Sequence, residues 1–220
     1  MSTSPKDRAL RRMAQDPISR RRLFAVTGGT GAVGALLAAC GDDDDDEAAT
    51  TTTSEMDDMA AQFGEGDLGI VNYALTLEYL EAAFYADVAD SGLFKGAELA
   101  LIKQIGAAEQ EHVDALVATA KQLGGPPADE PRATFPLDDA ESVLALAATV
   151  ENLGAAAYLG QAANIESPDV LAAALSIHSV EGRHAAVLNV LAGEPPTPDG
   201  AFARPADMNT VLNEVQPFLA

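Results

Sequence analysis

The stretch AAEQEHVDAL, residues 107–116, places a glutamate three positions before a histidine in an Ala-rich segment with a helical pattern. Glu109 and His112 would share one face of that helix, because side chains three positions apart point to the same side. The same spacing returns in SVEGRHAAVL, residues 179–188, with Glu181 and His184. Two of the three histidines in the chain stand in this pattern. The repeat predicts two equivalent helices that direct polar side chains to a common site.

A second pair of segments repeats with nearly the same offset along the chain. The sequence reads ALTLEYLEAAFY from Ala74 and AATVENLGAAAY from Ala147, which aligns Glu78 with Glu151. The offset between these two glutamates differs by a single position from the offset between the two Glu-x-x-His segments. A twofold repeat of a helical hairpin predicts a pseudo-symmetric site between its two halves.

The repeat also chooses between two acidic residues on the first of these segments. Glu81 aligns with Gly154, whereas Glu78 aligns with another glutamate. We therefore prefer Glu78 as a member of the site and expect Glu81 to point elsewhere on its helix.

Hydrophobic periodicity and turn residues predict four long helices, and a short helix near residues 207–217 of a C-terminal extension, residues 194–220. Glu141, three residues after Asp138, indicates a capping box at the start of the third helix. Ser167 followed by Pro168 indicates the start of the fourth helix. The four expected ranges are about 67–90, 96–123, 138–166 and 168–191.

The loops between these helices are unequal in length. Each hairpin has a short loop, whereas a much longer stretch, GGPPADEPRATFPL, connects the second helix to the third. Two hairpins with one long connection are typical of ferritin-like bundles. We therefore expect an all-α fold, a ferritin-like four-helix bundle with one long crossover between helices 2 and 3.

Six residues of these helices form the candidate site: one glutamate from each of two helices, and a Glu-x-x-His pair from each of the other two. They are Glu78, Glu109, His112, Glu151, Glu181 and His184. This is the ligand arrangement of di-iron and di-manganese carboxylate bundles. Four carboxylates neutralise two divalent ions, and mixed oxygen and nitrogen ligands favour iron or manganese. We expect two such ions, with iron favoured; the alternative is a hydrogen-bonded or salt-bridged core without metal.

Three further residues are candidates for positions next to the ligands. Tyr85 and Tyr158 lie two turns beyond the glutamates of their helices. We expect them to pack in the core with a satisfied hydroxyl; the alternatives are a hydrogen bond to a ligand or a radical role. His178 lies one turn before Glu181 and could support it or add a third nitrogen. Its repeat partner is Gly106, so symmetry favours an ordinary histidine on the helix face.

The net charge of −21 is unevenly distributed along the chain. Residues 1–22 hold seven Lys or Arg and two acidic residues, whereas the chain from Cys40 onward holds six basic and 32 acidic residues. So acidic a surface repels phosphate, and we do not expect the protein to bind nucleic acid. Residues 40–66, rich in Asp and Thr, are expected to form an acidic disordered spacer.

Residues 1–39 have the pattern of an export signal. Arg20, Arg21 and Arg22 precede an uncharged apolar run, and Leu-Ala-Ala comes directly before Cys40, the only cysteine. This pattern resembles a twin-arginine signal peptide that ends in a lipobox, in which Cys40 is lipidated. The alternative is an anchor helix that is never cleaved, although the run is short for a membrane span. Both readings predict an exported domain in the cell envelope, tethered to the outer face of the cytoplasmic membrane.

LTLEYLEAAFY and the two Glu-x-x-His helices resemble the ferritin-like domain family found in exported bacterial proteins and in desiccation-related proteins. The resemblance covers about residues 67–193. It implies a role for each of the six candidate ligands: Glu78 and Glu151 as terminal carboxylates, Glu109 and Glu181 as bridges between the metals, and His112 and His184 as ligands of one metal each.

The activity is open at this point, because relatives include ferroxidases, manganese catalases, oxygenases and proteins of unknown role. The leading hypothesis is redox chemistry at a dimetal centre with a small oxidant such as oxygen or peroxide. The second is a non-catalytic metal-binding or stress-protective envelope protein, and the third is a purely structural bundle. A homodimer is the base-rate expectation for the oligomeric state.

Overall fold

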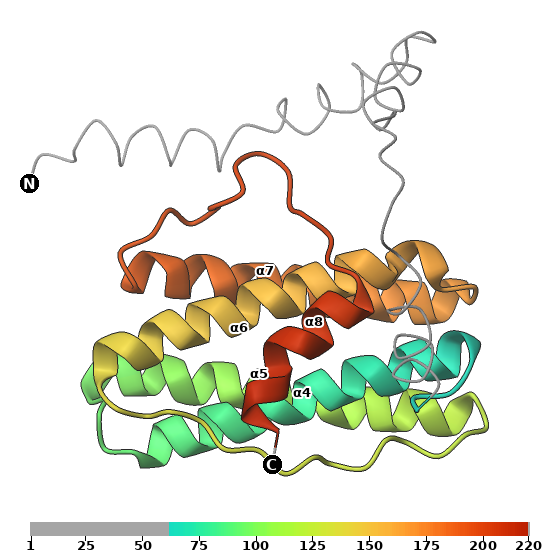
Figure 1. The fold of residues 1–220 in the computed structure, drawn as a ribbon, viewed down its shortest axis with the longest axis horizontal. Coiled ribbons are helices and arrows are strands. Elements are labelled where there is room, and N and C mark those ends of the chain that lie inside the picture. The colour runs from blue at the N-terminus through green and yellow to red at the C-terminus, as the bar shows by residue number, and fades with distance from the viewer. Residues whose placement is uncertain (1–61, 220) are drawn as a thin grey trace, which may run out of the picture. The chain divides into compact units, whose positions relative to one another are not determined.

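The computed structural model describes residues 62–219, and this part of the chain contains five α-helices and no named strand (Figure 1). Short 3₁₀ helices extend α6 and α8: η3, Ala162–Asn164, and η4, Gln216–Phe218. The five helices are α4, Gly66–Asp90; α5, Gly96–Gln122; α6, Ala140–Gln161; α7, Pro168–Leu191; and α8, Met208–Val215.

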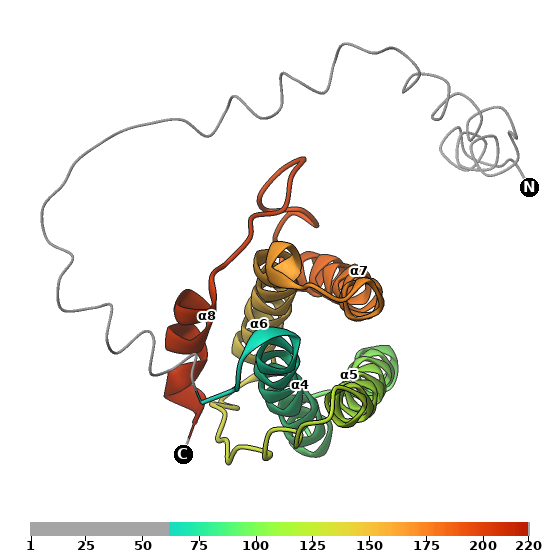
Figure 2. The ribbon, with the colours of Figure 1, turned by 90° about the vertical axis from the view of Figure 1, so that its right-hand side faces the viewer.

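The four long helices form two hairpins that pack into a bundle. Helix α4 packs along α5, and α6 packs along α7. Viewed from the end, the four helices surround a common interior, and α8 lies outside them beside α4 and α6 (Figure 2). The segment between α5 and α6 runs along the bundle in Figure 1. The predicted four-helix bundle with a long crossover is therefore confirmed.

The helix ends largely follow the turn residues that predicted them. Gly124 and Gly193 follow α5 and α7 with φ of 85°, a conformation that glycine adopts without strain. The Ser167 side chain accepts a hydrogen bond from the Val170 amide at the start of α7. The expected cap of the third helix was wrong by one residue, because Asp139 rather than Asp138 is the N-cap, and its box partner is Ser142 rather than Glu141.

Helix α8 and the first described residues add to the core beyond the predicted boundaries of the bundle. Val211 and Val215 of α8 are buried in a cluster with residues of α4 and α6. Phe63, which falls in the expected acidic spacer, is 8% exposed and packs edge-on against Tyr73 at 5.8 Å. The folded domain therefore begins inside the stretch expected to be spacer, because an aromatic side chain there finds an apolar partner.

The apolar core leaves the middle of the bundle to polar residues. One cluster gathers Phe84 and Val88 of α4 with Ile105 of α5, and another gathers Val71 and Leu75 of α4 with residues of the other long helices. Along each long helix, the residues of the first cluster and those of the second stand on opposite sides of one glutamate. These four glutamates are Glu78, Glu109, Glu151 and Glu181, each with 0% exposure.

Candidate metal centre

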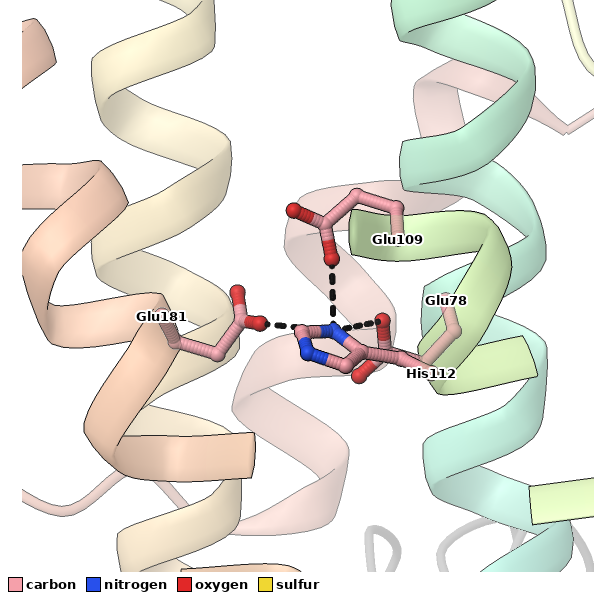
Figure 3. A group of neighbouring side chains, drawn as sticks. All are labelled: Glu78, Glu109, His112 and Glu181. Carbon is pink, nitrogen blue, oxygen red and sulfur yellow. Dashed lines mark hydrogen bonds and ion pairs between the residues drawn. The ribbon is translucent and has the colours of Figure 1, made fainter. Parts of the chain in front are cut away.

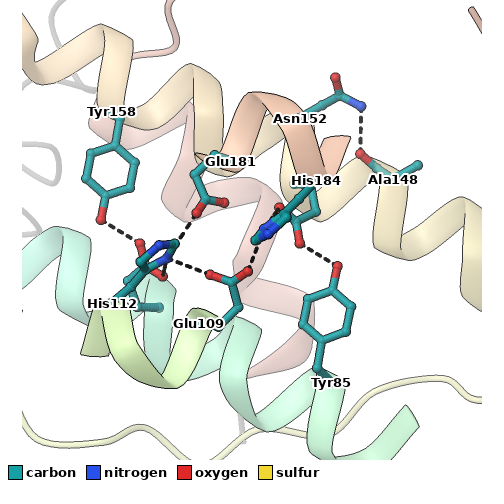
Figure 4. Close-up of polar contacts among 10 residues, drawn as sticks. Tyr85, Glu109, His112, Ala148, Asn152, Tyr158, Glu181 and His184 are labelled. Carbon is teal, nitrogen blue, oxygen red and sulfur yellow. Dashed lines mark hydrogen bonds and ion pairs between the residues drawn. The ribbon is translucent and has the colours of Figure 1, made fainter. Parts of the chain in front are cut away.

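The structure brings all six predicted site residues together at the centre of the bundle. Each of the four long helices contributes one glutamate, and α5 and α7 add a histidine three positions later (Figures 3 and 4). His112 is 9% exposed, and the side chain of His184 is 15% exposed. The helical periodicity that predicted a shared face therefore also removes these side chains from water.

Three carboxylates converge on a single nitrogen of His112. Its Nδ1 lies 2.8 Å from an oxygen of Glu109, 3.1 Å from one of Glu181 and 3.2 Å from one of Glu78 (Figure 3). An imidazole nitrogen carries at most one proton, so it cannot satisfy three acceptors from three helices at once. A cation bound among these groups would satisfy all of them.

The second histidine has a similar but less satisfied environment. His184 Nδ1 lies 2.8 Å from Glu109 Oε1 and 3.4 Å from Glu151 Oε2, yet neither contact has the direction of a hydrogen bond. Both oxygens of Glu181 are also buried without a hydrogen-bond partner. Buried polar atoms are rarely left unpaired, and so many in one place indicate a missing partner.

The side chains form two overlapping groups, each able to offer ligand atoms that lie within 4.8 Å of one another. Glu109 and Glu181 belong to both groups. The first group adds Glu78 and His112, and the second adds Glu151 and His184. Two ligand sets that share two carboxylates suggest a site for two metal ions.

Two tyrosines hold the unshared carboxylates from across the bundle. The Tyr158 hydroxyl on α6 donates to Glu78 Oε1 on α4, and the Tyr85 hydroxyl on α4 donates to Glu151 Oε1 on α6, each at 2.5 Å (Figure 4). The second oxygen of each glutamate faces a histidine. Each tyrosine therefore packs in an apolar cluster, as expected, and its hydroxyl also bonds to a candidate ligand.

Burial raises the pKa of most of the clustered carboxyls above the ordinary value of 4.5. It raises the pKa of Glu78 to about 7, despite the opposing effect of His112. Burial also raises the pKa values of Glu151 and Glu181, and neighbouring carboxylates raise them further. Without a cation, the folded cluster therefore retains protons that the same groups would release in water.

The histidines and Glu109 are shifted by their mutual attraction. Burial lowers the pKa of His112 and of His184, but the surrounding carboxylates outweigh it and raise these values to about 12 and about 10. Burial raises the pKa of Glu109, but the two histidines outweigh it and lower the net value. Positive charge is thus favoured on both imidazoles, which face the carboxylates of the cluster.

One acidic residue beside the cluster was missed. Glu81, expected to point elsewhere, is 3% exposed, and burial, followed by Glu181 and Glu78, raises its pKa well above the ordinary value. The expectation was wrong because it relied on repeat symmetry, and the aligned residue is a glycine. The signal available in the sequence was its position one helical turn after Glu78, on the same face.

The remaining candidates lie apart from the cluster or outside the described residues. His178 belongs to neither ligand group, and its Nδ1 donates to the backbone carbonyl of Ala155 at 3.0 Å. This favours the ordinary helix-face histidine over a third nitrogen ligand. Cys40 and the predicted export signal lie outside residues 62–219.

Comparison with known proteins agrees with this geometry. The family model described as Ferritin-like domain matches residues 66–194, more than half of the chain and nearly the same range as the four long helices. No curated protein matches the chain. The four-helix connectivity, the buried carboxylate and histidine cluster, and this match together establish that the chain belongs to the ferritin-like domain family.

Proposed function

We propose that this protein binds two iron or manganese ions, with iron favoured, and supports redox chemistry with a small oxidant such as oxygen or peroxide. The observation that carries the proposal is the convergence of three carboxylate oxygens on His112 Nδ1, each within 3.2 Å. When bound, the two ions would supply electrons to the oxidant. The alternative is a non-catalytic metal-binding or stress-protective protein, which would use the same ligands.

The donor set fits two divalent ions in number and in charge. Four carboxylates balance four positive charges, and two neutral imidazoles add ligands without adding charge. Glu109 and Glu181 would bind both ions, because each belongs to both ligand groups. The other four ligands would bind one ion each: Glu78 and His112 the first, and Glu151 and His184 the second.

The tyrosines would keep the unshared carboxylates in place when metal binds. Each tyrosine hydroxyl occupies one carboxylate oxygen and leaves the other directed at the cluster. A ligand held by an outer hydrogen bond is oriented before the ion arrives, which raises metal affinity. We therefore assign Tyr85 and Tyr158 a positioning role.

Export and lipid anchoring belong to the proposal and rest on the sequence alone. The basic residues, the apolar run and Cys40 would place the domain outside the cytoplasm. Twin-arginine export suits a metalloprotein, because that route moves proteins that have already folded around their metal.

Metal content tests the ligand assignment most directly. We expect the full chain, loaded anaerobically with Fe(II) or Mn(II) and then desalted, to retain two ions per chain by mass spectrometry. Glu109→Gln should reduce the content to below about one ion per chain, because this carboxylate is shared by both ligand groups. Glu78→Gln should affect mainly one ion. Glu111→Gln, an exposed neighbour on the same helix, should bind as the wild type does. Equal metal content in all four proteins would rule the assignment out.

Redox turnover separates the leading proposal from its alternative. We expect Fe(II)-loaded protein to be oxidised by oxygen or peroxide faster than the same concentration of free Fe(II), and Glu109→Gln to return the rate to that of the free ion. Stopped-flow absorbance of the Fe(III) product measures this iron oxidation. Oxygen release from peroxide by Mn(II)-loaded protein measures the other activity, peroxide removal. Two bound ions without turnover of either kind would support the non-catalytic protein.

The stability of the metal-free protein should depend on pH in a direction set by the shifted pKa values. The pKa of Glu78 rises from 4.5 to about 7 on folding. The stabilisation of the folded state by this group is therefore greatest below pH 4.5 and is lost as the pH rises to about 7. Because the pKa values of His112 and His184 are also raised, the folded state loses further stability as the pH rises above 6.5. Urea unfolding in chelator should therefore show a free energy of unfolding that falls from about pH 5 to about pH 9. With metal the trend should reverse, because protons compete with the ions for the ligands. A metal-free stability that rises over this range would contradict the protonation states described above.

Membrane fractionation tests the anchor. We expect the wild-type chain to sediment with membranes and Cys40→Ser to be released into the soluble exported fraction, because the lipid would have no attachment site. Replacing Arg20 and Arg21 by lysine should instead retain the protein in the cytoplasm. A Cys40→Ser protein that stays in the membrane would favour the uncleaved anchor helix.

A further inference from the structure

A fifth buried carboxyl group lies beside the cluster and belongs to neither ligand group. Glu81 is on α4, one turn after Glu78, and is 3% exposed. Within residues 62–219, no hydrogen bond holds its carboxyl group. A carboxyl group removed from most of its water is costly, so its position requires a physical reason.

Gly154 on α6 provides the space in which this carboxyl lies. A Cβ atom at Gly154 would lie 2.8 Å from Glu81 Oε1 and 3.3 Å from Glu181 Oε2. The two carboxylates thus approach the same point, and any larger residue would come between them. Glycine inside a helix destabilises the helix relative to alanine. Its presence in the middle of α6 indicates that this space is needed.

Glu81 and Gly154 also line a small cavity of about 20 Å³, and residues of α8 form part of its wall. The other residues around this cavity are apolar: Leu77, Leu80, Val150, Leu153, Val211 and Val215. Across Gly154 the carboxyl faces that of Glu181, which belongs to both ligand groups, and a cation held there would be a partner for both.

The two halves of the repeat differ at this position in a complementary way. The first half carries Glu81 where the second half carries Gly154, and the structure places these two residues against each other. We propose that Glu81 is a seventh protein ligand, which binds one of the two metal ions across the space above Gly154. This inference rests on the proposed function and makes the two ions inequivalent.

The test combines two substitutions that should remove the same contact. In Glu81→Gln the charged ligand is lost, and in Gly154→Ala the new methyl group would force the Glu81 carboxyl away from the site. We expect each variant of the full chain to bind one of two Co(II) ions at least about tenfold more weakly than the wild type. The double variant should be no weaker than either single variant. The d–d absorption of the bound Co(II) should also strengthen, as it does when an ion loses a ligand.

Matched controls separate the contact from general effects of the substitutions. Gly182→Ala places a methyl group in open space within α7, and Glu111→Gln removes an exposed carboxylate from α5. Both should bind two Co(II) ions with wild-type affinity and spectrum. The melting temperature of metal-free Glu81→Gln should be equal to that of the wild type or higher, so that weaker metal binding cannot reflect unfolding.

Two results would overturn the inference. Wild-type affinity for both ions in Glu81→Gln would mean that Glu81 does not act on the metal. Weaker binding with an unchanged Co(II) spectrum would mean that it only positions other ligands. A wild-type protein that binds no Co(II), Fe(II) or Mn(II) would instead contradict the proposed function itself, so the two failures are distinguishable.

Discussion

Four carboxyl groups and two imidazoles are removed from water inside this bundle, and the rest of the structure is arranged around that constraint. A charge buried without compensation costs several kcal/mol, a large part of the roughly 5–15 kcal/mol that holds a typical domain folded. Protons, tyrosine hydroxyls and the histidines compensate only in part, because both oxygens of Glu181 remain without a partner. A pair of divalent cations would resolve the remainder, since it would neutralise the carboxylates and satisfy the orphaned atoms together.

The cost of the cluster also explains why the site spans both hairpins. Tyr85 of the first hairpin donates to Glu151 of the second, and Tyr158 of the second donates to Glu78 of the first. In either hairpin alone, the glutamate that accepts this bond would be exposed, and the tyrosine hydroxyl would have no acceptor. Apolar clusters on both sides of the glutamates exclude water only when the hairpins pack. The site is therefore complete only in the packed bundle.

The sequence was most informative where local periodicity and the repeat agreed. The spacing of Glu109 and His112, matched in the second half by Glu181 and His184, predicted both the helix face and its burial. Turn residues located most helix ends because glycine and proline act locally. The predicted cap at Asp138 was off by one residue, because Asp139 and Ser142 offer the same spacing.

Features that depend on packing between distant segments were harder to predict. The partner of each tyrosine could not be read from its spacing to the glutamate on its own helix, because the bond crosses to the other hairpin. Glu81 was set aside because its repeat partner is Gly154, yet that glycine is what makes room for it. The second departure from symmetry has a related form: Gly106 stands where the other half has His178, and a Cβ there would lie 2.8 Å from the Cβ of Tyr85. In both places the repeat is broken by a glycine against a residue at or near the site. A symmetric repeat would give two equal half-sites, so these glycines mark two places where the halves differ.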